Sequence, residues 1–158
     1  WFYLATYVIQ LVGAFTIVGI VSGVRSGGSG FDEYQGLWQR SPRLAVAMGI
    51  FMLAMGGIPF FAGFVGKLAV FGSAISAGYL WLAIAGLIAA IAGLFFYLRI
   101  VVLMFFESPV MADAPGTATA APGLTGSAGF VVIACAALTV LLGIIPWPLL
   151  NLVRHALL

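Results

Sequence analysis

Four stretches of this chain contain no charged side chain, and they are 24, 23, 31 and 40 residues long (1–24, 44–66, 68–98 and 114–153). A transmembrane helix needs about 20 consecutive apolar residues, so each stretch is long enough for one span. Of the 158 residues, 64% are hydrophobic and 6% are charged. A water-soluble domain needs more polar surface than this, and a disordered chain needs the opposite composition. The sequence therefore predicts an integral membrane protein.

The predicted architecture is all-α, with four transmembrane helices at about 1–24, 43–72, 79–107 and 127–151. The connection 25–42 is rich in glycine and polar residues, 72–78 is a short uncharged turn, and 108–125 is rich in Pro, Ala, Thr and Gly. Because the chain begins at Trp1 inside an apolar run, we expect residues 1–158 to be the C-terminal part of a larger helical bundle.

The connection 25–42 contains an amphipathic pattern before the second helix. Its apolar residues Phe31, Tyr34, Leu37 and Trp38 have the spacing of one helix face, which predicts a short helix in the membrane interface. Ser41-Pro42 then supplies a helix N-cap and a first-turn proline.

Positively charged residues predict the orientation. Arg25, Arg40 and Arg43 lie in or next to the first connection, with Arg99 within reach of the same side, whereas the opposite side has only Arg154. By the positive-inside rule, the first and third connections should face the cytoplasm and both chain ends should face outward.

Lys67 lies deep within the second predicted span, with 23 uncharged residues between it and Arg43 and 31 between it and Arg99. An ammonium group in the bilayer costs about 2.5–3.5 kcal/mol on insertion scales. One interpretation is that the side chain snorkels toward the helix end near Gly72, roughly 8 Å away. The other is that Lys67 is a buried protonatable group on an ion path.

A glycine- and proline-rich run, Met55-Gly56-Gly57-Ile58-Pro59, precedes Lys67 in the same span. Pro59 has no N–H to donate to the carbonyl of Met55, and paired glycines loosen the backbone. A carbonyl freed inside a bilayer must find a partner in protein or water, and transporters bind ions at such broken helices. The sequence therefore predicts a second helix broken at Gly56–Pro59, with water near the break and Lys67 as a proton carrier.

Several short motifs carry a resemblance. They are Asp32-Glu33-Tyr34-Gln35-Gly36-Leu37, Ser41-Pro42, Gly57-Ile58-Pro59, Ala62-Gly63-Phe64-Val65-Gly66-Lys67 and Tyr97-Leu98-Arg99. Together they resemble subunit N of the proton-pumping NADH:quinone oxidoreductase, respiratory complex I. Subunit M of that complex typically has glutamate in place of Lys67, and subunit L continues into a long C-terminal extension, so subunit N is favoured. Gln10 departs from the family, whose members often have asparagine there.

The resemblance implies an antiporter-like subunit of fourteen helices in a bacterial plasma membrane, with this chain as the last four. It implies that Lys67 carries protons toward the outer face, coupled to electron transfer from NADH to quinone. Flavin, iron–sulfur clusters, NADH and quinone are expected on partner subunits, with no cofactor or metal on this chain. The expected partners are the other membrane subunits and the lipid bilayer, and no nucleic acid. The family's other proton-path residues have no counterpart here, so this chain alone is not expected to pump.

Other polar residues have two interpretations each. Tyr3, Tyr7 and Gln10 share one helix face and either line a hydrated path or make hydrogen bonds between helices. Arg99 either joins the proton path or is structural, by snorkelling or an ion pair. His155 either lies at the interface or takes part in proton exit.

Small residues at helical spacing predict close contacts between helices. The two rows are Gly19 with Gly23 and Ala85 with Ala89 and Gly93.

Three functions remain open from the sequence. The chain is a proton-translocating subunit of a redox-driven complex, a subunit of a multi-subunit cation/proton antiporter, or a structural membrane subunit in which Lys67 only pairs with a neighbouring helix.

Overall fold

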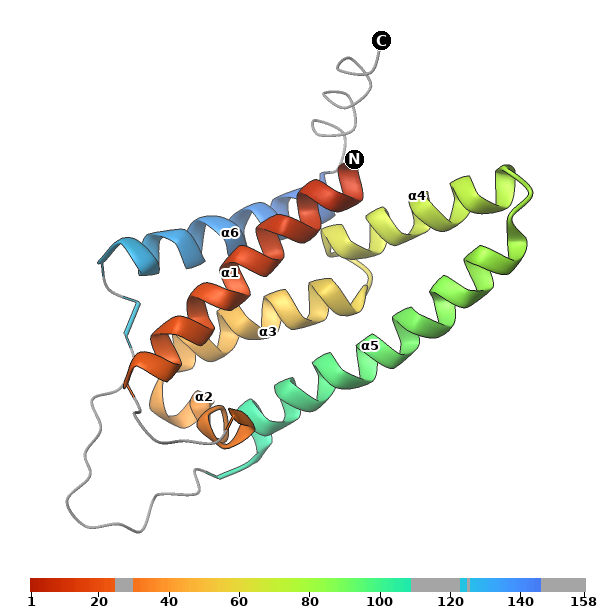
Figure 1. Ribbon diagram of the computed structural model, residues 1–158. Coiled ribbons are helices and arrows are strands. Elements are labelled where there is room, and N and C mark those ends of the chain that lie inside the picture. The colour runs from red at the N-terminus through yellow and green to blue at the C-terminus, as the bar shows by residue number, and fades with distance from the viewer. Residues whose placement is uncertain (25–29, 109–122, 125, 146–158) are drawn as a thin grey trace, which may run out of the picture.

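The computed structural model describes residues 1–24, 30–108, 123–124 and 126–145, and every regular element in these residues is helical. The elements are α1 (Phe2–Val24), the 3₁₀ turn η1 (Gly30–Glu33), α2 (Leu37–Arg40), α3 (Pro42–Gly56), α4 (Ala62–Ser76), α5 (Leu80–Phe106) and α6 (Gly126–Ile144) (Figure 1). The all-α prediction is confirmed for the part of the chain that the structure describes.

Three of these helices, α1, α5 and α6, are long and apolar enough to cross a membrane. They correspond to the predicted helices at 1–24, 79–107 and 127–151, although the end of the last one lies outside the described residues. The predicted second helix, 43–72, is replaced by α3 and α4, which have 15 residues each. At 1.5 Å per residue each is about 22 Å long, which is shorter than a hydrocarbon core of about 30 Å.

The two short helices lie at the centre of the arrangement. Figure 1 shows α5 returning alongside α4 and then alongside α3, and it contacts both. Helices α1 and α6 pack against each other and also against both α3 and α4. Each of the three long helices therefore contacts both α3 and α4.

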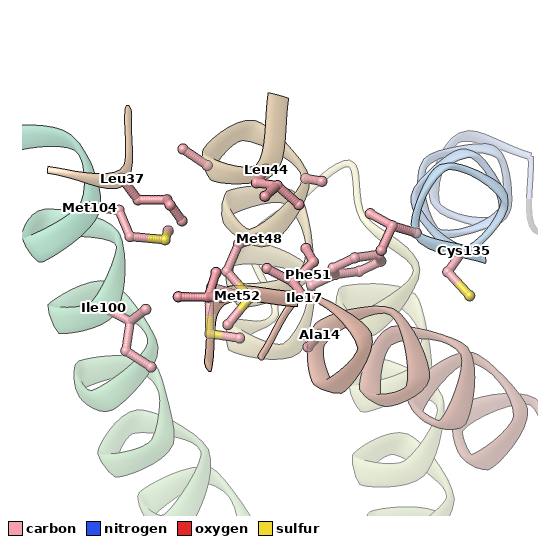
Figure 2. Close-up of a cluster of buried hydrophobic side chains, with 14 of the residues drawn as sticks. Ala14, Ile17, Leu37, Leu44, Met48, Phe51, Met52, Ile100, Met104 and Cys135 are labelled. Carbon is pink, nitrogen blue, oxygen red and sulfur yellow. The ribbon is translucent and has the colours of Figure 1, made fainter. Parts of the chain in front are cut away.

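The apolar core is built around α3 (Figure 2). Phe51 and Leu44 of α3 are fully buried, as are Ile17 of α1 and Met104 of α5. The ring of Phe51 lies against Gly13, where a Cβ atom would come 2.2 Å from it, so glycine is required for this contact. Packing of large side chains therefore fixes α3 between its neighbours.

The segment 30–40 differs from the predicted single amphipathic face. Gly36 adopts a left-handed conformation (φ 62°) that separates η1 from α2, and its N–H donates to the carbonyl of Leu103 near the end of α5 (3.2 Å). Leu37 consequently turns into the core, while Phe31 and Trp38 remain 42% exposed. The prediction of one interfacial face is wrong because a glycine turn divides the pattern.

The predicted turn at 72–78 is also shorter in the structure. Gly72 is accommodated within α4, which continues to Ser76, and Gly78 takes the left-handed conformation (φ 82°) before α5 begins. A single glycine does not end a helix unless its backbone adopts the left-handed conformation. The stop is at Gly78.

The close helix contacts also involve different glycines from those predicted. A Cβ on Gly19 would meet nothing within 4 Å. By contrast, a Cβ on Gly63 would lie 1.9 Å from the carbonyl oxygen of Ala54, and one on Gly143 of α6 would lie 2.4 Å from the carbonyl oxygen of Phe60. Two of the tight approaches therefore lie at the joint between α3 and α4.

Candidate functional site

The end of α3 is closed by a backbone motif. Gly57 adopts a left-handed conformation (φ 83°), and its N–H donates to the carbonyls of Ala54 (3.0 Å) and Leu53 (3.1 Å). The N–H of Ile58 donates to Leu53 as well (3.1 Å). These bonds form a Schellman motif, which satisfies two of the four carbonyls that a helix leaves without a donor at its C-terminal end. The last two carbonyls of α3 need another donor.

Lys67 supplies that donor from α4. Its Nζ donates to the carbonyl oxygens of Met55 (2.8 Å) and Gly56 (3.1 Å). A cation at this point also faces the negative end of the α3 dipole. The side chain thus reaches back to the joint, and the interpretation that it snorkels toward Gly72 is wrong. The Met55 carbonyl therefore has a protein donor, and water near the break stays a prediction.

The joint itself does not depend on Pro59 in the way that the sequence predicts. Helix α3 has already ended at Gly56, so Pro59 interrupts no helical hydrogen bond and is exposed to the surroundings. The connection between α3 and α4 contains two left-handed residues, Gly57 and Phe60 (φ 80°). Phe60 carries a side chain in a conformation that favours glycine and is 82% exposed. The conformation of Gly57, rather than the missing N–H of Pro59, terminates α3.

A cavity of about 330 Å³ adjoins Lys67. Besides the lysine, its lining includes Tyr3 and Tyr7 of α1 and Tyr97 of α5. The rings of Tyr3 and Tyr7 stack with their centroids 5.8 Å apart. A water molecule occupies about 30 Å³ in the liquid, so the volume suffices for several waters.

The far wall of this cavity consists of small residues. Gly86, Ala89, Ala90 and Gly93 of α5 line it. Ala89 and Gly93 belong to the row predicted to mark a close helix contact, and in the structure they border this open space. Small side chains on α5 therefore leave room beside the lysine.

Gln10 lies on the same face of α1 as the two tyrosines and is 1% exposed. Neither atom of its amide group has a hydrogen-bond partner among the described residues. Its Oε1 would be 3.7 Å from a Cβ on Gly63, at the point where α4 meets the carbonyl of Ala54. The predicted polar face thus packs against the first turns of α4, where Tyr3 also contacts Gly66.

A second cavity, of about 520 Å³ and with a mostly apolar lining, lies between α1, α3 and α5. It extends to Glu33 and Tyr34 in the segment 30–40, and it shares Met55 and Tyr97 with the lysine cavity. Burial raises the pKa of Tyr34, and the nearby Glu33 carboxylate raises it further. The two shared side chains, Met55 and Tyr97, therefore lie between the two cavities.

Two predicted site residues do not join this group. The guanidinium carbon of Arg99 lies 5.7 Å from the centroid of the Phe31 ring, a cation–π arrangement, and Arg99 does not line the lysine cavity. His155 falls outside the described residues. Among the described residues, no three His, Cys, Asp or Glu side chains gather in a way that could hold a metal ion.

Tyr97 is the member of the site that sequence reasoning did not single out, beyond its place in a motif. A helical period gives the missing signal, because Ala89, Gly93 and Tyr97 recur at intervals of four residues and share a face. The backbone carbonyls that bind Lys67 have no sequence signal of their own.

Comparison with known proteins identifies the family. A family model described as "NADH:quinone oxidoreductase/Mrp antiporter, TM" matches residues 1–113. The chain belongs to this family. Its relatives include NADH-quinone oxidoreductase subunit N of Mycobacterium tuberculosis, 42% identical over 160 residues that cover 98% of this chain and 29% of the relative. The subunits N of Thermobifida fusca (43% over 153 residues; 95% and 27%) and Chromohalobacter salexigens (39% over 155 residues; 96% and 32%) are similar.

The resemblance to subunit N that the motifs indicate is thus confirmed, and the chain spans about a third or less of the length of these relatives. Membership of this transmembrane family, three apolar helices and bacterial relatives make it a multi-pass protein of the bacterial plasma membrane.

Proposed function

We propose that this chain is part of a proton-translocating membrane subunit of an NADH:quinone oxidoreductase, with Lys67 as the intramembrane proton carrier. The names of the relatives support the complex. The observation that carries the role of Lys67 is its geometry: an amine held by the Met55 and Gly56 carbonyls, beside a cavity lined by tyrosines.

In this proposal α3 and α4 together form a fourth, discontinuous span. Their combined length is sufficient for a bilayer, and α5, which is long enough to span by itself, contacts both of them. Non-helical backbone within a membrane is tolerated only where protein or water satisfies it. The Schellman motif and Lys67 meet that requirement for the last four carbonyls of α3, at residues 53–56. Residues 1–158 then belong to one antiporter-like domain.

As a proton carrier, Lys67 must gain and lose a proton reversibly. The carbonyls compensate part of the cost of holding an ammonium away from water, and the cavity supplies space for the water that exchanges the proton. Tyr7 of α1 lines this cavity, and the buried amide of Gln10 lies about one turn further along the same helix. In this proposal Arg99 is structural, through its cation–π contact with the Phe31 ring. The role of His155 in proton exit stays a prediction.

Electron transfer takes place elsewhere in this proposal. NADH, flavin, iron–sulfur clusters and quinone bind to partner subunits, and this chain contributes proton transfer to their coupled reaction. Its partners are the other membrane subunits and the lipids.

The test is Lys67→Met in the intact complex, with Ser73→Ala on the same helix as a control. We expect Lys67→Met to assemble while proton pumping and coupled quinone reduction fall about tenfold, because a thioether carries no proton. Subunit level and pumping in inverted membrane vesicles are measured together. If Lys67 only holds the end of α3, the subunit level falls while activity per assembled complex stays normal, and the carrier role is refuted.

A second candidate is a subunit of a multi-subunit cation/proton antiporter, which the family description also includes. Purification of the full-length protein from its native membrane distinguishes the two. Flavin and iron–sulfur subunits should accompany it in the first case and be missing in the second.

A further inference from the structure

The second cavity, of about 520 Å³, has the size and the lining of a ligand site. Ligand sites hold about 300–1,000 Å³ and combine mostly apolar walls with a few polar groups. Three methionines of α3, Met48, Met52 and Met55, line this space, and we name it the methionine cavity. Methionine side chains are flexible and fit an apolar partner of irregular shape. The walls therefore suit a hydrocarbon chain.

One end of the methionine cavity is formed by the segment 30–40, where Glu33 lines the space and is 9% exposed. Glu33 accepts a hydrogen bond from Arg40, but it does so through its backbone carbonyl. Its carboxylate has no hydrogen-bond or ion-pair partner among the residues that the structure describes. Burying a carboxylate without a partner is costly. The carboxylate therefore indicates a ligand that brings N–H donors on a positive charge.

Aromatic rings and a cation surround the same end of the cavity. Phe31 lines it, and the ring of Phe31 meets that of Phe96 edge-on, with the centroids 6.0 Å apart. Arg99 is exposed, and its guanidinium carbon lies 5.7 Å from the Phe31 centroid. Ring faces attract ammonium groups, and a guanidinium pairs well with a phosphate. Both charges of a zwitterionic head group thus have a counterpart beside Phe31.

The position of the cavity in the bundle matches that of a lipid in one leaflet. The segment 30–40 directly precedes α3, and Gly36 bonds to Leu103 near the end of α5, so this segment lies at one end of the bundle. From there the lining continues along α3 as far as Met55. Met48 and Met55 are about 10 Å apart along the helix, and one leaflet has about 15 Å of hydrocarbon. A head group at Glu33 places its acyl chain against the methionines.

We propose that the methionine cavity binds an acyl chain of a phospholipid whose head group ends in a primary ammonium, with the ammonium at Glu33 and the phosphate at Arg99. The rings attract any ammonium, but the buried carboxylate needs N–H donors, which the quaternary head group of phosphatidylcholine lacks. The site therefore selects phosphatidylethanolamine. The proposal adds a binding role to the cation–π contact of Arg99 and is independent of whether Lys67 carries protons.

The first experiment uses two neighbouring phenylalanines of α5 in the intact complex. Phe96 lines the methionine cavity, and Phe95, which is exposed outside that lining, is the matched control. Each is replaced in turn by photoreactive p-benzoylphenylalanine, and the complex is irradiated in vesicles with equal amounts of phosphatidylethanolamine and phosphatidylcholine. The mass of each adduct identifies what lies beside the probe.

We expect the probe at position 96 to give about a tenfold excess of the phosphatidylethanolamine adduct, the effect of one hydrogen bond to a charged group. The probe at position 95 should give both adducts equally. Equal adducts at position 96 would overturn the proposal. A cross-link from position 96 to a peptide would also overturn it, because a protein segment would then fill the cavity.

The second experiment changes the charges while the probe stays at position 96. Glu33→Gln should abolish the excess of phosphatidylethanolamine. Glu107→Gln, an exposed carboxylate at the end of α5 outside the lining, is its control and should keep the excess. Arg99→Gln should lower both adducts together, because both lipids carry the phosphate. An excess that survives Glu33→Gln would mean that this carboxylate does not select the lipid, and the proposal would fail.

A measurement without the probe decides if the photoreactive residue prevents assembly. Mass spectrometry of the lipid that stays on the purified complex compares Glu33→Gln with Glu107→Gln and with the unmodified protein. We expect Glu33→Gln to retain less phosphatidylethanolamine than the other two, at an unchanged subunit level. Equal retention in all three would overturn the proposal.

Discussion

Helices α3 and α4 have the same length and similar apolar composition, yet they pack very differently. Ten of the 15 residues of α3 are buried, against three of the 15 in α4, and these three (Ala62, Gly63 and Gly66) are all small. Large side chains from the other helices surround α3, whereas α4 touches its neighbours mainly through its first turns. The comparison teaches that packing energy is concentrated in α3, while the lysine belongs to the helix that is more loosely held.

The largest expected effect contrasts one phenylalanine from each helix. Phe51 of α3 is fully buried, so Phe51→Ala should destabilise the subunit by about 3–5 kcal/mol. Phe64 of α4 is half-buried, and Phe64→Ala should cost less than half as much. The measurement is the rate at which the subunit is lost from the purified complex on heating. Equal losses for the two variants would contradict the comparison.

A smaller effect is expected at the contact that attaches α4 to α3. A Cβ on Gly63 would overlap the backbone carbonyl of Ala54, so Gly63→Ala must push the two helices apart, at a cost of about 1–3 kcal/mol or more. Gly72→Ala, further along α4, meets nothing and should be neutral or slightly stabilising. Subunit levels in the membrane report both changes. A neutral Gly63→Ala would show that the start of α4 is not held tightly.

The smallest effects compare the two residues that could end α3. Gly57→Ala places a side chain in the left-handed region and brings its Cβ to 3.1 Å from Nζ of Lys67, so we expect a loss of about 1–2 kcal/mol together with reduced pumping. Pro59→Ala should cost less than about 1 kcal/mol and leave pumping normal, because Pro59 interrupts no helical bond. A larger loss of stability and pumping in Pro59→Ala than in Gly57→Ala would mean that Pro59, and not Gly57, ends α3. Thermal stability and pumping of the assembled complexes are compared side by side.

Long apolar runs predict α1 and α5 closely because hydropathy and length decide those helices. Lys67 stands out in the sequence because an uncompensated charge in a membrane is expensive. Its partners do not, since they are backbone carbonyls that any residue could supply. The sequence places the break at Gly56–Pro59 and explains it by the missing N–H of Pro59 and by the paired glycines, without showing which residue ends α3. A missing N–H can be recognised from the residue type, whereas the left-handed conformation of Gly57 depends on how α4 packs back onto α3.

The bonds from Lys67 to Met55 and Gly56 join the protonation of one side chain to the position of a helix end. An ammonium binds these carbonyls more strongly than a neutral amine does, so each protonation tightens the hold of α4 on α3 and each deprotonation relaxes it. Thermodynamic linkage makes this relation reciprocal: any movement elsewhere in the subunit that pulls the two half-helices apart must also change how readily Lys67 keeps its proton. A mechanical displacement transmitted through neighbouring helices would thus be converted at this joint into the release or capture of a proton.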